Sequence, residues 1–242
     1  MTSVNVHTHH RMGDHLICYG GIKEIAKRYD QIVVRTLDLY LFNVTRLYSS
    51  IPNVKVIPLR PDQWTNDGIL FCCTNWWFDQ VKDWYNPETR SKPYTLGEQM
   101  IFDRFWYHIA DLPFNLKWDN FYLERDIDTE KNIFYEILGL KDGEEFIFLH
   151  DDPYNKDEDR TIKRNYINKN IRLIDIEKYK DISILDTTYL IERAKEIHVI
   201  NSAFLTFIDL MQIKHKALFY HKYTRSNPVE QVALKLNWHI IE

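Results

Sequence analysis

The sequence predicts an α/β protein built from two Rossmann-like halves, each with its own parallel sheet. Two observations predict this class. Short runs rich in β-branched and aromatic residues alternate with helical patterns, and the alternation occurs once before residue 60 and again after Glu145. Because a strand–helix–strand unit closes in a right-handed way onto a parallel sheet, we expect two compact halves whose sheets face a cleft.

In the first half, β-branched runs predict strands at 3–9, 31–36 and 54–59, with a fourth at 68–74. Apolar residues recur with helical spacing at 14–29 and 39–50, which predicts helices there. The Trp-rich segment 75–85 is also expected to be helical. The segment 86–95 holds two prolines and few apolar groups, so it is predicted to be a loop.

The middle of the chain is helical and aromatic. Helices are predicted at 96–110 and 128–138, the second ended by Gly139, with an aromatic segment at 111–126 between them. The second half then has strands at 145–150, 171–176, 196–201 and 216–221, and helices at 187–195 and 203–214. The closing segment 229–242 is predicted to be a helix that ends in a short strand or tail. The expected domains are 1–92, a connecting region 93–140, and 141–242.

Composition excludes several classes of protein. The chain has 242 residues, of which 45% are hydrophobic, and a net charge of −4, which argues against disorder and gives no support for nucleic-acid binding. No signal peptide or membrane span is visible, so a soluble, cytoplasmic protein is expected. The three cysteines, Cys18, Cys72 and Cys73, lack metal-site spacing and are expected to be reduced.

The first loop that can carry chemistry follows the first predicted strand and holds Gly13, Asp14 and His15. Gly13 permits a tight turn or a close approach to a ligand. Asp14 at a helix start has two interpretations: a carboxylate that caps backbone N–H groups, or, with His15 as the alternative, a general base. Gly20 and Gly21 inside the same helix indicate that another helix or a substrate comes close, helix packing being the commoner cause.

The second loop follows the strand at 145–150 and combines two carboxylates, Asp151 and Asp152, with the downstream cations Arg160, Lys163 and Arg164. Cations at the carboxyl end of a strand suit a diphosphate, which a guanidinium binds with two hydrogen bonds. The alternative is a solvated loop of mixed charge, which is the better interpretation of its middle residues 155–159.

The third loop, Asn201-Ser202-Ala203, joins a predicted strand to a predicted helix. Backbone N–H groups and a hydroxyl at a helix N-terminus form an anion site, and Ser202 as an ordinary N-cap is compatible with that role. Asp209, further along the helix, is interpreted as a solvated residue. Asp126 and Asp128 resemble a metal-binding pair but precede a helix, so a structural use is favoured.

The order of these motifs resembles that of heptosyltransferase-like glycosyltransferases of the GT-B fold. The opening segment "RMGDHLICYGGIKEIAKRY" is similar to the Leu-Gly-Asp turn that leads into their first helix, and "LDTTYLIERAKEIHVINSAFLTFIDLM" is similar to their nucleotide-sugar half. Between them, "FIFLHDDP" and "PFNLKWDNFYLERD" resemble segments of small putative glycosyltransferases of bacteria and viruses. Two departures are Asn201-Ser202-Ala203 in place of Asp-Ser-Gly, and a shorter chain.

The resemblance implies a metal-independent transfer of a sugar from a nucleotide-sugar, as co-substrate and without a cofactor, to a glycan or other hydroxyl acceptor. Residues 1–92 would bind the acceptor, with Asp14 as base. Residues 141–242 would bind the donor, whose leaving diphosphate Arg160, Lys163 and Ser202 would stabilise. The alternatives are an inactive scaffold with the same fold, a nucleotide-sugar epimerase or hydrolase, and a lectin-like protein that stacks sugars on its aromatic residues.

Overall fold

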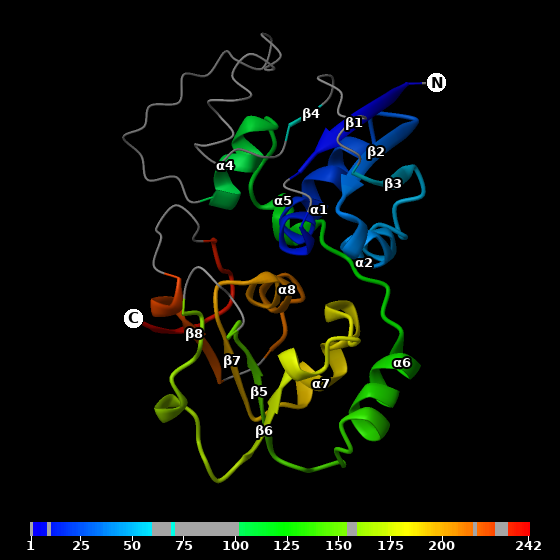
Figure 1. Ribbon diagram of the computed structural model, residues 1–242. Helices are drawn as coiled ribbons and strands as arrows, with labels where there is room; N and C mark the ends of the chain where they lie inside the picture. The colour runs from blue at the N-terminus through cyan, green and yellow to red at the C-terminus, as the bar shows by residue number, and fades with distance from the viewer. Residues whose placement is uncertain are drawn as a thin grey trace. The chain divides into compact units, whose positions relative to one another are not determined.

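The computed structural model describes residues 2–8, 11–59, 69–70, 102–153, 159–214, 217–225 and 232–242. The chain forms two compact units (Figure 1). Unit 1 is Met1–Tyr122 with Pro228–Ala233, and unit 2 is Leu123–Asn227 with Leu234–Glu242. The division at residue 122 falls inside the connecting region predicted over 93–140. The predicted helix 75–85, the loop 86–95, Cys72 and Cys73 lie outside the described residues.

Unit 1 holds a parallel sheet in the order β3-β2-β1-β4. Its strands are β1 (Ser3–His7), β2 (Gln31–Thr36), β3 (Val54–Pro58) and β4 (Ile69–Leu70). Its helices are α1 (Met12–Ala26), α2 (Leu41–Leu47), α4 (Phe102–Ile109) and α5 (Leu116–Asp119), with a 3-10 turn at Asp38–Tyr40. The expected strands at 3–9, 31–36 and 54–59 are confirmed, and of the fourth the structure describes residues 69 and 70, which form β4. Helix α1 begins at Met12, ahead of the expected start at 14, and the predicted helix 39–50 is divided between the 3-10 turn and α2.

Helix α1 lies in backbone contact with α5, which accounts for Gly20. A Cβ atom on Gly20 would lie 1.9 Å from the carbonyl oxygen of Leu116, so only glycine fits. The Asn120 side-chain amide donates to the Gly20 carbonyl at 3.0 Å. Nearby, the Tyr107 hydroxyl accepts from Gly21 N (3.1 Å) and donates to the Ile17 carbonyl (2.9 Å). Helix packing is therefore the use of this glycine pair.

A buried ion pair lies elsewhere in unit 1. Lys117 Nζ is 2.6 Å from Asp103 Oδ2, and both side chains are fully buried. The pair also bonds to the backbone: the N–H groups of Ala233 and Arg104 donate to Asp103, and the Ala233 carbonyl accepts from Lys117 at 2.8 Å. Such pairs are tolerated only when their hydrogen bonds are satisfied, and here the late segment of the chain satisfies them.

Unit 2 holds a five-stranded parallel sheet in the order β6-β5-β7-β8-β9. The strands are β5 (Phe146–His150), β6 (Arg172–Asp175), β7 (Glu196–Val199), β8 (Leu218–His221) and β9 (His239–Ile241). The helices are α6 (Ile127–Asn132), which continues as a π-helical turn at Ile133–Ile137, α7 (Thr188–Arg193) and α8 (Ala203–Leu210). Short 3-10 turns lie at Arg164–Tyr166, Ile176–Lys178, Ile184–Asp186 and Lys222–Thr224.

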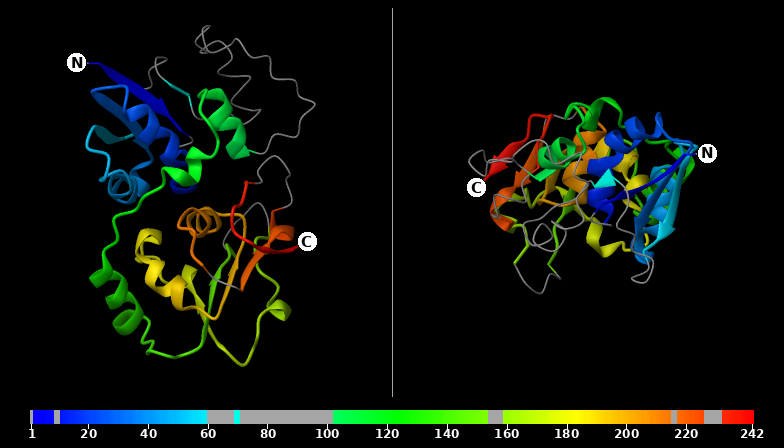
Figure 2. Two further views of the ribbon diagram at one scale, coloured as in Figure 1. Left: turned by 180° about the vertical axis from the view of Figure 1, so that it is seen from behind. Right: turned by 90° about the horizontal axis from the view of Figure 1, so that it is seen from above.

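The interior strand β5, which lies between β6 and β7, is buried along its whole length, and this explains its continuous apolar run. Ile147 and Leu149 pack in one apolar cluster with Ile162, Ile167 and Ile200. The segment 121–126 enters unit 2 without regular structure (Figure 2). At its end the Asp126 carboxylate accepts from Thr129 N at 3.0 Å and caps α6, so the structural use expected for this residue is observed.

The predicted helix over 229–242 is wrong for the residues that the structure describes there. Residues 232–238 have no helical structure, and β9 follows. The reason is Asp209, which is fully buried rather than solvated, another expectation that is wrong. Its carboxylate accepts from the N–H groups of Lys235 and Leu236 at 2.9–3.0 Å, and from Trp238 Nε1 at 3.2 Å. A buried carboxylate needs such donors, and the segment satisfies it by leaving its own N–H groups out of a helix.

Candidate functional site

The strands of unit 2 present their carboxyl ends at one edge of the sheet. From β5 the chain passes to β6 on one side, then crosses back to β7 on the other side of β5. The reversal of direction between β5 and β7 is a topological switch point, where open α/β sheets bind their ligands. His150 is the last residue of β5, and Asn201, Ser202 and the start of α8 follow β7.

Two side chains meet across this switch point. The Ser202 hydroxyl lies 3.2 Å from His150 Nδ1, and His150 Nε2 lies 2.8 Å from Glu177 Oε1. Glu177 comes from the turn that follows β6. The ring of Phe204 packs on the imidazole with ring centroids 4.5 Å apart, which restricts its rotation. The ends of β5 and β7 are therefore joined by a hydrogen bond between Ser202 and His150, and the end of β6 approaches His150 through the ion-pair contact of Glu177.

Ser202 occupies the N-cap position of α8 with an extended backbone, but its side chain makes no capping hydrogen bond. The hydroxyl is directed to His150 instead. The first N–H groups of a helix have no partner within the helix, and no hydrogen bond to another described residue is made by the Ala203 N–H at the start of α8. Asn201, which precedes the cap, is buried. The predicted strand–Asn-Ser-Ala–helix junction thus lies at the switch point.

Asp151 is fully buried directly after β5. Its Oδ2 accepts from Ile162 N at 3.0 Å and lies 3.2 Å from the guanidinium of Arg164. Its Oδ1 has no hydrogen-bond partner among the described residues. Burial raises the pKa of Asp151, and the Arg164 charge partly opposes that rise. Arg164 also lies 3.8 Å from Asp175, so two carboxylates fix a cation whose side chain is 43% exposed.

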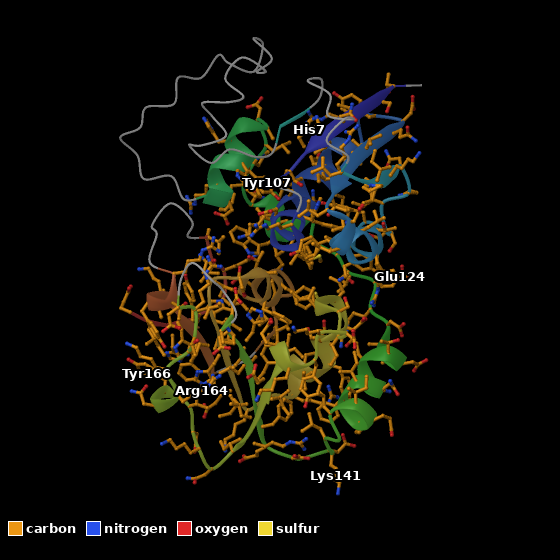
Figure 3. All side chains as sticks on the ribbon, viewed as in Figure 1. His7, Tyr107, Glu124, Lys141, Arg164 and Tyr166 are labelled. Atoms are coloured by element: carbon orange, nitrogen blue, oxygen red, sulfur yellow. The ribbon has the colours of Figure 1, made fainter. Side chains whose placement is uncertain are left out.

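The other predicted cations belong to the same loop. Arg160 forms an isolated bridge with Asp152, with Asp152 N donating to the Arg160 carbonyl at 3.2 Å. Lys163 N donates to the Tyr223 hydroxyl at 2.8 Å, and Lys163 Nζ lies 4.8 Å from the centre of the same ring. The loop after β5 is therefore tied to the end of β8. Figure 3 labels Arg164 and Tyr166, which lie on one turn of that loop.

A buried histidine pair lies deeper in unit 2. His198 Nδ1 is 2.9 Å from His221 Nε2, and His198 Nε2 is 3.1 Å from Glu196. Burial lowers the pKa of both imidazoles, that of His221 to about 4. Tyr166 and Tyr223 contact the ring of His221. The pair is neutral at pH 7 and supports the end of β8.

The remaining predicted residues lie in unit 1, at the start of α1. Gly13 is inside the first turn of the helix rather than in a loop before it. The Asp14 carboxylate accepts from Arg11 N at 3.2 Å, so the capping interpretation of this residue is observed. His15 is fully buried, with Nδ1 3.5 Å from the Tyr48 hydroxyl. Since β1 has β2 on one side and β4 on the other, this helix start follows the switch point of the first sheet.

The structure thus brings Asp151, Asp152, Arg160, Lys163 and Ser202 to one edge of unit 2. Sequence reasoning did not select His150, Asp175 and Glu177. The signal for them was positional, since each lies at the end of a predicted strand or directly after it. Within the described ranges, no group of three or more His, Cys, Asp or Glu side chains is arranged to hold a metal ion. In the same part of the chain, no helix combines the length and apolar character needed to cross a membrane.

Two all-parallel sheets with this order of helices define a GT-B-like α/β fold, as the sequence predicts. The chain is similar to the crystal structure of a glycosyl transferase family 9 protein from Veillonella parvula DSM 2008. The two structures superpose with a TM-score of 0.56 and 7% sequence identity, over 99% of this chain and 85% of that chain. No protein-family model matches the sequence. No curated protein matches it either. The likeness establishes the fold.

Proposed function

We propose that the protein is a glycosyltransferase that moves a sugar from a nucleotide-sugar to a hydroxyl acceptor. The observation that carries the proposal is the switch point of unit 2, where the start of α8 and fixed cations share one edge. Anions bind at such helix starts because the N–H groups and the helix dipole favour negative charge. The fold neighbour, a family 9 glycosyl transferase, supports the same general activity.

The leaving group of this reaction is a nucleoside diphosphate, which gains negative charge as the bond to the sugar breaks. In our proposal the N–H groups at the start of α8 and the Ser202 hydroxyl donate to its phosphates. Arg164 and Lys163, with Arg160 further along the loop, supply the positive charge. Fixed donors and cations of this kind offset leaving-group charge without reorganising during the reaction, and the reaction we propose needs no divalent metal.

Asp14 is the proposed general base that takes the proton of the acceptor hydroxyl. It is preferred to His15 because its side chain is only half-buried, whereas that of His15 is fully buried. The capping bond from Arg11 N orients the carboxylate. His15, beside Tyr48, is assigned to the support of this helix start. We expect Asp14→Asn to lower transfer by about 100-fold or more with donor binding unchanged.

The test begins with thermal unfolding in the presence of EDTA and of UDP, GDP, ADP, CMP or dTDP, alone and as their common sugars. We expect one nucleotide to raise the unfolding temperature. The same rise should be smaller in Lys163→Gln. It should be unchanged in Lys141→Gln, which alters a lysine in the segment that leads into β5, at the other end of the sheet (Figure 3). A flat response of folded protein to every nucleotide at millimolar concentration would refute the donor site.

A further inference from the structure

We infer that Ser202 is an activated nucleophile and that unit 2 hydrolyses esters of small carboxylic acids. The inference goes beyond glycosyl transfer and needs no nucleotide-sugar. It rests on the chain of contacts from Ser202 to His150 at 3.2 Å and from His150 to Glu177 at 2.8 Å. A nucleophile within hydrogen-bond reach of a base, and a base oriented by a third group, is the arrangement that activates a serine.

The two contacts favour one arrangement of the protons. The Glu177 carboxylate lies 2.8 Å from His150 Nε2, and this negative charge favours the proton on that nitrogen. His150 Nδ1 then presents a lone pair to the Ser202 hydroxyl, which is the tautomer that a base requires. Phe204 packs on the imidazole and holds its plane. Among the charged groups near His150, Asp151 is paired with Arg164, which leaves Glu177 to stabilise the imidazolium.

The position of Ser202 adds a second, independent argument. A serine at an N-cap normally accepts from the helix backbone, but this one makes no such bond. Its hydroxyl lies 3.2 Å from His150 Nδ1 instead. A nucleophile at a strand-to-helix turn also has the N–H of the following residue beside it, here Ala203, as a donor for an oxyanion. Ser202 itself is half-buried next to Phe204, which suits a small acyl group.

The ester hydrolysis that we infer consumes only the ester and one water molecule. The Ser202 oxygen attacks the ester carbonyl, and its proton passes to His150 Nδ1. The ester C–O bond breaks, and the leaving alkoxide takes that proton from His150. Water then attacks the acyl-serine, with His150 again accepting a proton and returning it to the Ser202 oxygen. The products are an alcohol and a carboxylic acid.

The experiment uses the full chain, a fluorophosphonate probe that labels activated serines, and hydrolysis of p-nitrophenyl acetate. We expect one label, located on Ser202 by mass spectrometry and absent from Ser202→Ala. The Glu177→Gln variant should fold, because Glu177 is partly exposed. It should label and hydrolyse about tenfold or more slowly than the wild type, since the imidazolium of His150 loses its counter-charge. Ser183→Ala, a serine cap elsewhere in unit 2, is the matched control and should label at the wild-type rate.

Two results would overturn the inference. The first is folded wild-type protein that does not label, or that labels at another residue. The second is a Glu177→Gln variant that labels as fast as the wild type. Neither result depends on a nucleotide, so a failed donor screen with a labelled Ser202 would count against glycosyl transfer alone.

Discussion

Replacement of Gly20 by alanine tests the packing of α1 most sharply. The new Cβ would lie 1.9 Å from the Leu116 carbonyl oxygen, 2.7 Å from its carbonyl carbon and 3.2 Å from the Cα of Lys117, while real Cβ contacts are not shorter than 3.0 Å. Helix α5 would have to move away from α1. Overpacking of this kind costs about 1–3 kcal/mol of stability. The movement would also weaken the hydrogen bond from Asn120 to the Gly20 carbonyl, which costs about 1 kcal/mol more. The better helix propensity of alanine returns about 1 kcal/mol.

We therefore expect Gly20→Ala to lower the free energy of unfolding by about 1–3 kcal/mol. The measurement is urea denaturation followed by circular dichroism and by tryptophan fluorescence. Thr45→Ala, on an exposed position of α2, is the matched control and should change stability by less than about 0.5 kcal/mol. A Gly20→Ala protein as stable as the wild type, or more stable, would refute the backbone contact between α1 and α5.

Three further predictions concern buried polar groups. Tyr107→Phe removes the hydroxyl between Gly21 N and the Ile17 carbonyl, and should cost about 1–2 kcal/mol in urea denaturation; an unchanged midpoint would contradict the bridge. Asp209→Asn weakens the acceptor of the Lys235 N–H, so trypsin should cut after Lys235 faster than in the wild type, and equal rates would count against this anchor. The pKa of His221 is lowered to about 4, so the unfolded chain binds a proton that the folded chain does not, and stability should fall by up to about 3 kcal/mol as the pH drops from about 6.5 to about 4. In His221→Phe that slope should flatten, and a slope equal to that of the wild type would show that another group causes it.

The fold could be predicted from the sequence because both sheets follow local patterns. The β-branched run at 31–36 and the aromatic and aliphatic run at 145–150 are both typical of strands, and each became a largely buried parallel strand. The closing segment could not be predicted in the same way. Its irregular structure depends on Asp209, a residue 26 positions before Lys235 in the chain. Local propensity favours a helix there, and a buried carboxylate that needs N–H donors overrides it.

Part of the site could also be predicted, because local strand patterns locate the loops that carry it. Ser202 and Lys163 lie in loops that each follow a predicted strand, and such loops are expected at the carboxyl edge of a parallel sheet. The partner of Ser202 could not be named, because the contact to His150 joins residues 52 positions apart. Glu177 was missed since a single glutamate after a strand carries no pattern of its own. The glycine pair in α1 was visible, but only the structure identifies α5 and Tyr107 as the groups that approach it.

The most direct test of the central claim, a donor site at the carboxyl edge of the second sheet, is hydrogen–deuterium exchange with and without the nucleoside diphosphate selected by thermal unfolding. We expect slower exchange in two segments, residues 159–166 and the start of α8 at 201–205, and no change at 139–145, the segment that leads into β5. Slower exchange confined to 139–145 or to residues of unit 1, with 201–205 unaffected, would contradict the claim.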